Sequence, residues 1–187
     1  MSETHISPDH LTSMDIERRS PLAEPIRVLG DGTRLAVQTE GALLLLLSRP
    51  GSIDEAWIRQ QLGAGMAADL RPFSPGQWLL VSDGRLDHAV IAETLRERVD
   101  IVDQSHGRVR LELEGRTVQT VLAQATGLDL HAAPVALERP ATTLIGHIGV
   151  HITQTGPEVF ELIVMRSLAE SLVGEIALLC RHPLGQA

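Results

Sequence analysis

Two regions of the chain show how its apolar positions are spaced. RVRLELE at Arg108–Glu114 alternates strictly, which predicts a strand with Val109, Leu111 and Leu113 facing the core. The block Leu43–Leu47 does not alternate, which is typical of a strand covered on both faces. The chain is therefore expected to contain both a one-sided and a fully enclosed strand.

Other segments carry the same strand signals of alternation and β-branched or apolar composition. The last two segments listed below are expected to pair as a hairpin through Thr155-Gly156-Pro157. The predicted strands are Arg34–Thr39, Ala42–Ser48, Gln77–Ser82, Ile101–Asp103, Arg108–Glu114, Thr143–Thr153 and Val159–Met165.

Apolar residues at helical spacing predict helices between these strands. Two of them open with a capping box, Ser52 with Glu55 and Ser167 with Glu170. The predicted helices are Ser52–Leu62 (ended by Gly63), Leu86–Arg98, Thr117–Thr126 (ended by Gly127) and Ser167 to about Leu179. Because strand pairs alternate with helices in both halves, we predict an α+β fold of mostly antiparallel sheets, with helices on one face and two similar halves.

The ends of the chain differ from its middle. Residues 1–20 are polar and lack periodicity, which indicates a flexible N-terminal arm. Residues 21–180 are expected to form one domain, and residues 181–187 a short C-terminal tail. The segment Arg18-Arg19-Ser20-Pro21-Leu22 is expected to order only against a partner, as a docking segment.

The amino-acid composition and net charge argue against several classes of function. The net charge of −8 and the absence of any cluster among the sixteen basic residues, all Arg, argue against nucleic acid and anionic membrane surfaces. The aromatic share of 2% leaves few rings for stacking ligands. The longest apolar run, Ala42–Leu47, is far below the roughly 20 residues that span a bilayer. With one cysteine and no signal peptide visible, the chain is expected to be cytoplasmic.

His147 and His151 have the spacing of a helical metal pair, but HIGVHIT has the composition of a strand. On a strand their positions lie about 13 Å apart, which is too far for one ion. We therefore expect two solvated or partner-facing strand residues.

Asp103, Ser105 and His106 place an acid, a hydroxyl and an imidazole close together in sequence. Adjacent strand residues point to opposite faces, so sequence adjacency argues against a catalytic triad and favours a turn. Asp129 and His131 could form a local acid–base pair or be ordinary surface groups.

The remaining candidates also have structural explanations. Gly30–Gly32 and Gly63–Gly65 match neither dinucleotide nor phosphate loops and are interpreted as turns. Cys180 is interpreted as a small buried apolar residue. No catalytic, cofactor-binding or metal-binding residue is therefore predicted.

Several segments in order resemble the gamma subunit of the heterotetrameric sarcosine oxidase family. The segments are RRSPL (Arg18–Leu22), FSPGQWLLV (Phe73–Val81), VDQSHGRVRLELEG (Val102–Gly115), TGLDLHAAPV (Thr126–Val135), ATTLIGHIGVHI (Ala141–Ile152) and FELIVMRSLAESL (Phe160–Leu172). The sequence departs from the family pattern at Gln77, Thr126, Ala132 and Leu168, which indicates a divergent member.

The resemblance implies a fold related to the folate-binding aminomethyltransferases and a non-catalytic subunit that stabilises the large subunit of a flavoenzyme complex. That complex would oxidatively demethylate sarcosine or a related secondary amine. Its alpha, beta and delta subunits would be the partners and would carry FAD, FMN, NAD and tetrahydrofolate, with no cofactor in this chain. Since Arg pairs well with carboxylates, the expected partner interface comprises Arg18, Arg19, Pro21, Leu22, Arg108 and Arg110.

Three alternatives stay open at this point. The chain could be an autonomous folate-binding module in which Asp103 or Asp129 contacts the pterin. It could be the third subunit of an N-methylglutamate dehydrogenase-type complex. A stand-alone enzyme using Ser105 and His106 is the third alternative.

Overall fold

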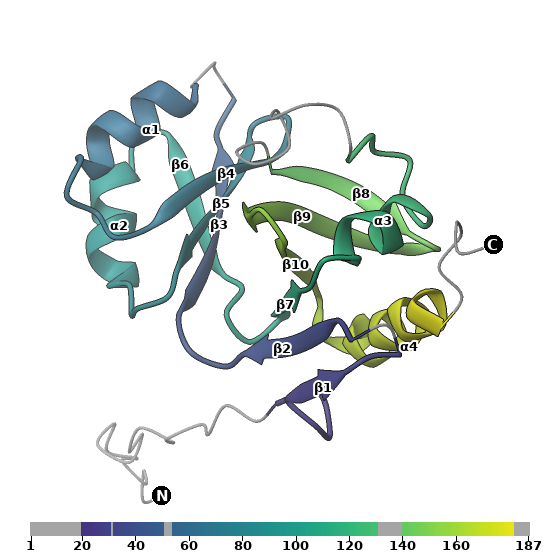
Figure 1. Ribbon diagram of the computed structural model, residues 1–187. Helices are drawn as coiled ribbons and strands as arrows, with labels where there is room; N and C mark the ends of the chain where they lie inside the picture. Colours follow the sequence, from purple (N-terminus) through teal and green to yellow (C-terminus); the bar gives the residue numbers. More distant parts are fainter. Residues whose placement is uncertain (1–19, 31, 51–53, 131–139, 182–187) are drawn as a thin grey trace, which may run out of the picture.

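Two antiparallel sheets stack face to face, and a pair of helices covers the outer face of each sheet (Figure 1). The computed structural model describes residues 20–30, 32–50, 54–130 and 140–181. The order of layers is helices, four-stranded sheet, six-stranded sheet, helices. The α+β prediction, with antiparallel sheets and helices on one face of each, is therefore confirmed.

The four-stranded sheet has the order β4-β5-β3-β6, and every neighbouring pair is antiparallel. Its chain order β3-α1-β4-β5-α2-β6 is the split βαβ arrangement. Ile58, Ile91 and Leu95 of the two helices pack against the sheet. The bounds are β3 Ala42–Ser48, α1 Glu55–Leu62, β4 Asp69–Ser74, β5 Gln77–Ser82, α2 His88–Leu95 and β6 Val99–Asp103.

The six-stranded sheet has the order β1-β2-β7-β10-β9-β8, so strands from both ends of the chain share it. Its strand order differs from that of the other sheet, although both halves place two helices on one face. The helical side of this sheet buries the larger core, with Phe160 at its centre. The bounds are β1 Ile26–Val28, β2 Arg34–Gln38, β7 Arg108–Glu114, α3 Val118–Ala123, β8 Ala141–Ile145, β9 Ile148–Gly156, β10 Val159–Met165, the 3₁₀ turn η3 Arg166–Leu168 and α4 Ala169–Arg181.

The position of β3 explains its uninterrupted leucines. Leu44 and Leu46 face α1 and α2, whereas Leu43, together with Leu79 of β5, faces Ile163 of the six-stranded sheet. Both sides of the strand are therefore apolar, as predicted. On β7, Val109, Leu111 and Leu113 face the core, which confirms the strict alternation there.

The predicted single strand Thr143–Thr153 is wrong, because the chain reverses at Gly146-His147. Ile145 pairs with Ile148 across a two-residue turn, and Gly146 has φ +57°. Glycine at the first central position is the signature of a tight hairpin turn. The predicted hairpin between β9 and β10 is confirmed, with Gly156 paired to Val159.

Two strands were missed and the helix starts differ from the prediction. β4 is an edge strand, so Pro72 can be accommodated without the loss of a hydrogen bond to a neighbouring strand. The same proline made the segment look unlike a strand in the sequence. β1 is only three residues long. The N-cap of α1 is Asp54, whose Oδ1 accepts a hydrogen bond from Trp57 N at 2.9 Å.

The two capping boxes are therefore not formed as predicted. Asp54 replaces Ser52 as the cap, and Ser52 lies outside the described residues. Ser167 lies within η3, so it does not cap α4. Helix α2 is capped by Asp87, and both α2 and α3 are shorter than predicted. The predicted stop of the first helix at Gly63 is confirmed, with φ +78°.

Gly41 lies where the chain crosses from one sheet to the other. Its φ is +94°, and a β-carbon there would lie 2.3 Å from the carbonyl oxygen of Ser82. Gly41→Ala is expected to lower the free energy of unfolding by about 2 kcal/mol or more. Gly174→Ala, in the open interior of α4, is expected to raise it by about 0.5–1 kcal/mol. Melting temperatures of the two variants would test these opposite signs, and equal shifts would contradict them.

Candidate functional site between the two sheets

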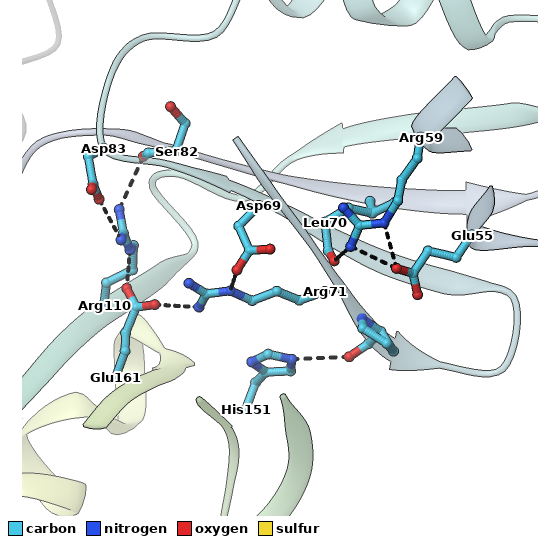
Figure 2. A network of polar contacts seen from close by, with 11 residues as sticks. Glu55, Arg59, Asp69, Leu70, Arg71, Ser82, Asp83, Arg110, His151 and Glu161 are labelled. Atoms are coloured by element: carbon cyan, nitrogen blue, oxygen red, sulfur yellow. Dashed lines mark hydrogen bonds and ion pairs between the residues drawn. The ribbon is translucent and has the colours of Figure 1, made fainter. Parts of the chain in front are cut away.

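The centre of the sheet–sheet interface holds three charged side chains (Figure 2). Glu161 points from the middle of β10 toward the four-stranded sheet and is 4% exposed. It accepts hydrogen bonds from Arg71 Nη1 on β4 and from Arg110 Nε on β7. Burying charges is costly unless they are paired and hydrogen-bonded, and here one carboxylate serves two guanidinium groups.

Two further acids complete the network at its rim. Arg71 Nε donates to Asp69 Oδ2 at 2.8 Å, and Arg110 Nη2 donates to Asp83 Oδ1 at 2.8 Å. Arg110 Nη1 also donates to the carbonyl of Ser82 at 3.1 Å. These contacts tie β4 and the end of β5 to β7 and β10. They therefore join the two sheets through directional bonds, beside the apolar contact of Ile163.

A polar pocket of about 390 Å³ adjoins this network. Its walls include Arg71, Arg110 and Glu161 together with Glu112 and Thr155. Each guanidinium group in the wall already has carboxylate partners. Four carboxylates and two guanidinium groups line the pocket, so both arginines are compensated within the chain. The network therefore has the features of a structural connection between the sheets.

His151 lies on the same face of the six-stranded sheet and is 1% exposed. Its Nε2 is 3.1 Å from the carbonyl oxygen of Pro72. Since a carbonyl only accepts, Nε2 is the donor in this contact. The other ring nitrogen, Nδ1, is buried and has no hydrogen-bond partner in the described part of the chain.

The pKa of His151 is lowered from 6.5 to about 4. Burial is the main cause, and the positive charges of Arg71 and Arg108 act in the same direction. The Pro72 carbonyl and the Glu161 carboxylate oppose this shift. Protonation would therefore place an additional cation among the guanidinium groups that face His151.

The sequence interpretation of the two histidines needs a correction. His147 occupies the exposed turn between β8 and β9, so it is not a strand residue. His151 is neither solvated nor free to face a partner, because β4 of the other sheet covers it. Among the residues described, no group of three or more His, Cys, Asp or Glu side chains could hold a metal ion.

The Asp103–His106 segment forms a turn, as predicted. The Oδ1 atom of Asp103 accepts from Ser105 N at 2.8 Å, and Ser105 Oγ accepts from Leu43 N at 3.0 Å. Partial burial raises the pKa of Asp103, but the hydrogen bonds with Ser105 outweigh this effect, so the pKa lies below its ordinary value. The hydroxyl thus holds the start of β3, and it is not bonded to the imidazole of His106.

Other candidates fall where the sequence analysis placed them or beyond the described residues. Cys180 is 2% exposed within the larger core, as predicted. Gly32 closes a turn by donating to the carbonyl of Leu29 at 2.9 Å. Asp129 is described, but His131 lies outside the described residues, so their pairing stays a prediction.

The residues expected at a partner interface have different surroundings. Arg18 and Arg19 lie outside the described residues. Leu22 is 3% exposed and packs into this chain's own larger core. Arg110 belongs to the buried network, whereas Arg108 is half-buried with its guanidinium 4.9 Å above the ring of Phe73. Pro21 is partly buried, and the role of these residues in binding a partner stays a prediction.

Sequence reasoning missed Arg71 and Glu161. A signal existed for Glu161, because a single acid within the apolar strand VFELIVM predicts a buried and paired carboxylate. No comparable sequence signal marked Arg71, because it precedes a proline in β4, a strand that the spacing of apolar residues did not predict.

The fold places the chain in a known class. The aminomethyltransferase T of the glycine cleavage system from Bartonella henselae superposes with a TM-score of 0.55 at 17% identity. The alignment covers 79% of this chain and 48% of that protein. The chain thus has an aminomethyltransferase-like fold, as predicted.

Sequence comparison assigns the chain to a family within this fold class. The sarcosine oxidase gamma subunit family matches residues 54–175, so the chain belongs to that family. A curated relative, the sarcosine oxidase subunit gamma of Corynebacterium sp. (strain U-96), is 26% identical over 182 residues, which cover 83% of this chain and 86% of the relative.

A solved structure has the same fold along most of its length. One chain of the heterotetrameric sarcosine oxidase from Corynebacterium sp. U-96, in complex with pyrrole 2-carboxylate, superposes with a TM-score of 0.70 at 21% identity. The alignment covers 87% of this chain and 94% of that chain. The resemblance to sarcosine oxidase gamma subunits noted from the sequence is therefore confirmed.

Proposed function

We propose that this chain is the gamma subunit of a heterotetrameric sarcosine oxidase-type flavoenzyme complex and that it stabilises the large subunit. The complex would oxidatively demethylate sarcosine or a related secondary amine. The observation that carries the proposal is the family match over residues 54–175. The inter-sheet network supports it, since the buried arginines Arg71 and Arg110 are paired within the chain.

The partners would be the alpha, beta and delta subunits, which would hold FAD, FMN, NAD and tetrahydrofolate. In support, the related Corynebacterium enzyme is described as heterotetrameric. In the described part of the chain no helix is long and apolar enough to cross a membrane. We place the complex in the cytoplasm.

Co-expression of the chain with the other subunits from the same genome tests the proposal. A tagged copy of this chain is expected to retain the large flavoprotein on a column and in gel filtration. Omitting the chain should lower the yield of the large subunit and the amine-dependent reduction of flavin at least several-fold. Recovery of an active, stable flavoprotein without this chain would contradict the proposal.

Folate binding by the isolated chain is the second candidate, because the fold is shared with an aminomethyltransferase. One acid considered for it, Asp103, is engaged by Ser105 in a turn. Calorimetry with tetrahydrofolate on the isolated chain should give no binding heat if this chain is only a subunit.

The amine that the complex oxidises is a separate question. Assaying the complex with sarcosine and with N-methylglutamate would distinguish a sarcosine oxidase-type from an N-methylglutamate dehydrogenase-type specificity.

A further inference from the structure

One row of the six-stranded sheet is only partly covered by the four-stranded sheet. Leu144 of β8 pairs with Gly149 of β9, and Met165 of β10 pairs with Arg108 of β7. The β9–β10 register, continued by one residue, sets Met165 beside Gly149. These four residues, here called the shelf, thus form one cross-strand row over four strands, about 14 Å across.

The shelf residues point toward the four-stranded sheet. Strand alternation puts Gly149 on the same face as His151, and Met165 on the same face as Ile163. Despite this direction, Leu144 is 56% exposed and Met165 is 51% exposed. The described elements of this chain therefore leave about half of each of these two large apolar residues uncovered.

The floor of the shelf between these side chains is open. A β-carbon at Gly149 would have no atom within 4 Å, and its backbone has no positive φ. Gly149 thus leaves a position without a side chain between Met165 and Leu144, here called the depression. A β-carbon therefore fits at position 149, and the backbone conformation does not require glycine there.

One end of the shelf carries an unbalanced positive charge. The guanidinium group of Arg108 is half-buried over Phe73, and its buried Nε has no hydrogen-bond partner among the residues that the structure describes. No ion pair joins Arg108 to a carboxylate within the described ranges, in contrast with Arg71 and Arg110 on the same layer. Burial also lowers the pKa of Arg108. A carboxylate from outside the chain would compensate this charge.

We propose that the shelf is the docking surface for a partner subunit of the complex, and that it receives a segment with a large apolar side chain next to an Asp or Glu. The apolar side chain fills the depression over Gly149, and the carboxylate pairs with Arg108. A polypeptide fits better than a small ligand, because the surface is an open row across strands. This inference rests on the proposed function.

Co-expression with the partner subunits, scored by the ratio of large subunit to tagged chain, tests the shelf. Gly149→Leu fills the depression and should lower that ratio at least ten-fold, while its melting temperature stays equal or rises. Gly174→Leu is the matched control, since that glycine on α4 is also open to a β-carbon. It should retain the partner like the wild type.

Arg108→Gln and Leu144→Gln provide independent variants at the two ends of the shelf. Both should weaken retention, and only Arg108→Gln should make it less sensitive to salt. Arg96→Gln, at the exposed C-cap of α2, is the charge control and should behave as wild type.

The outcomes separate the two proposals. If folded Gly149→Leu and Arg108→Gln retain the partner as the wild type does, the shelf is not the docking surface, while the subunit function stands. If the wild-type chain itself retains no partner, the proposed function fails and the shelf assignment fails with it. If Gly149→Leu does not fold, retention by Leu144→Gln and Arg108→Gln decides the question in the same way.

Discussion

Glu161→Gln is expected to lower the free energy of unfolding by about 3–5 kcal/mol, the usual cost of breaking a buried ion pair. Glu161 is the buried acid between Arg71 and Arg110, and its side chain is 5% exposed. The neutral amide keeps the volume but leaves two guanidinium groups without their shared counter-charge. For a chain of this length the melting temperature should fall by roughly 6–20 °C.

Two further variants show whether the loss comes from the buried network. Glu93→Gln removes an exposed acid paired to Arg96 on α2, and it should change stability by no more than about 0.5 kcal/mol. The double variant with Arg71→Met and Glu161→Gln should lose less stability than the sum of the two single variants. The reason is that Arg71→Met removes the guanidinium charge that Glu161→Gln leaves unpaired. Additive losses, or a stable Glu161→Gln variant, would show that the network does not connect the sheets.

The spacing of apolar and polar residues predicted most strands of the two sheets. β7 alternates because one face lies on the larger core and the other carries polar groups, and β3 does not because both of its faces are apolar. The hairpin of β9 and β10 followed from Gly156 and Pro157. These features depend on periodicity within one strand, which the sequence contains directly.

The errors concern features that periodicity does not encode. Gly146-His147 lies between two apolar residues, so the run resembles one long strand, although glycine at that position marks a two-residue turn. The cap of α1 is Asp54, two residues after Ser52, which is an equally acceptable cap, and local contacts decide between the two. β4 was missed because its proline is tolerated only at an edge, and edge position is a property of the assembled sheet.

The candidate site was less predictable than the fold. Glu161 could be suspected from its apolar surroundings, but its partners lie 90 and 51 residues away in sequence. His151 was interpreted as exposed because a histidine between apolar residues fits either face of a strand. Burial of His151 depends on the stacking of the second sheet over β9, which no local pattern contains.

The buried His151 should make the protein less stable in mild acid. Its pKa is about 4 in the folded chain and 6.5 in the unfolded chain. At pH 7 the folded chain is neutral at this residue and the unfolded chain is mostly neutral, so its contribution to the pH dependence is still small. As the pH falls through 6.5, only the unfolded chain gains the proton, and the loss grows until the folded chain is protonated near pH 4. Between pH 7 and pH 5 the expected loss is about 2 kcal/mol.

Chemical denaturation between pH 7 and pH 5 measures this loss, in a window above the range where most carboxylates titrate. His151→Gln keeps a donor for the Pro72 carbonyl but cannot take the proton, so its stability should change much less across the window. His147→Gln, in the exposed turn, should retain the wild-type slope. A wild-type slope in His151→Gln would show that another group causes the acid sensitivity. A flat wild-type profile would mean that the sheets separate enough at His151 for water to solvate its cation.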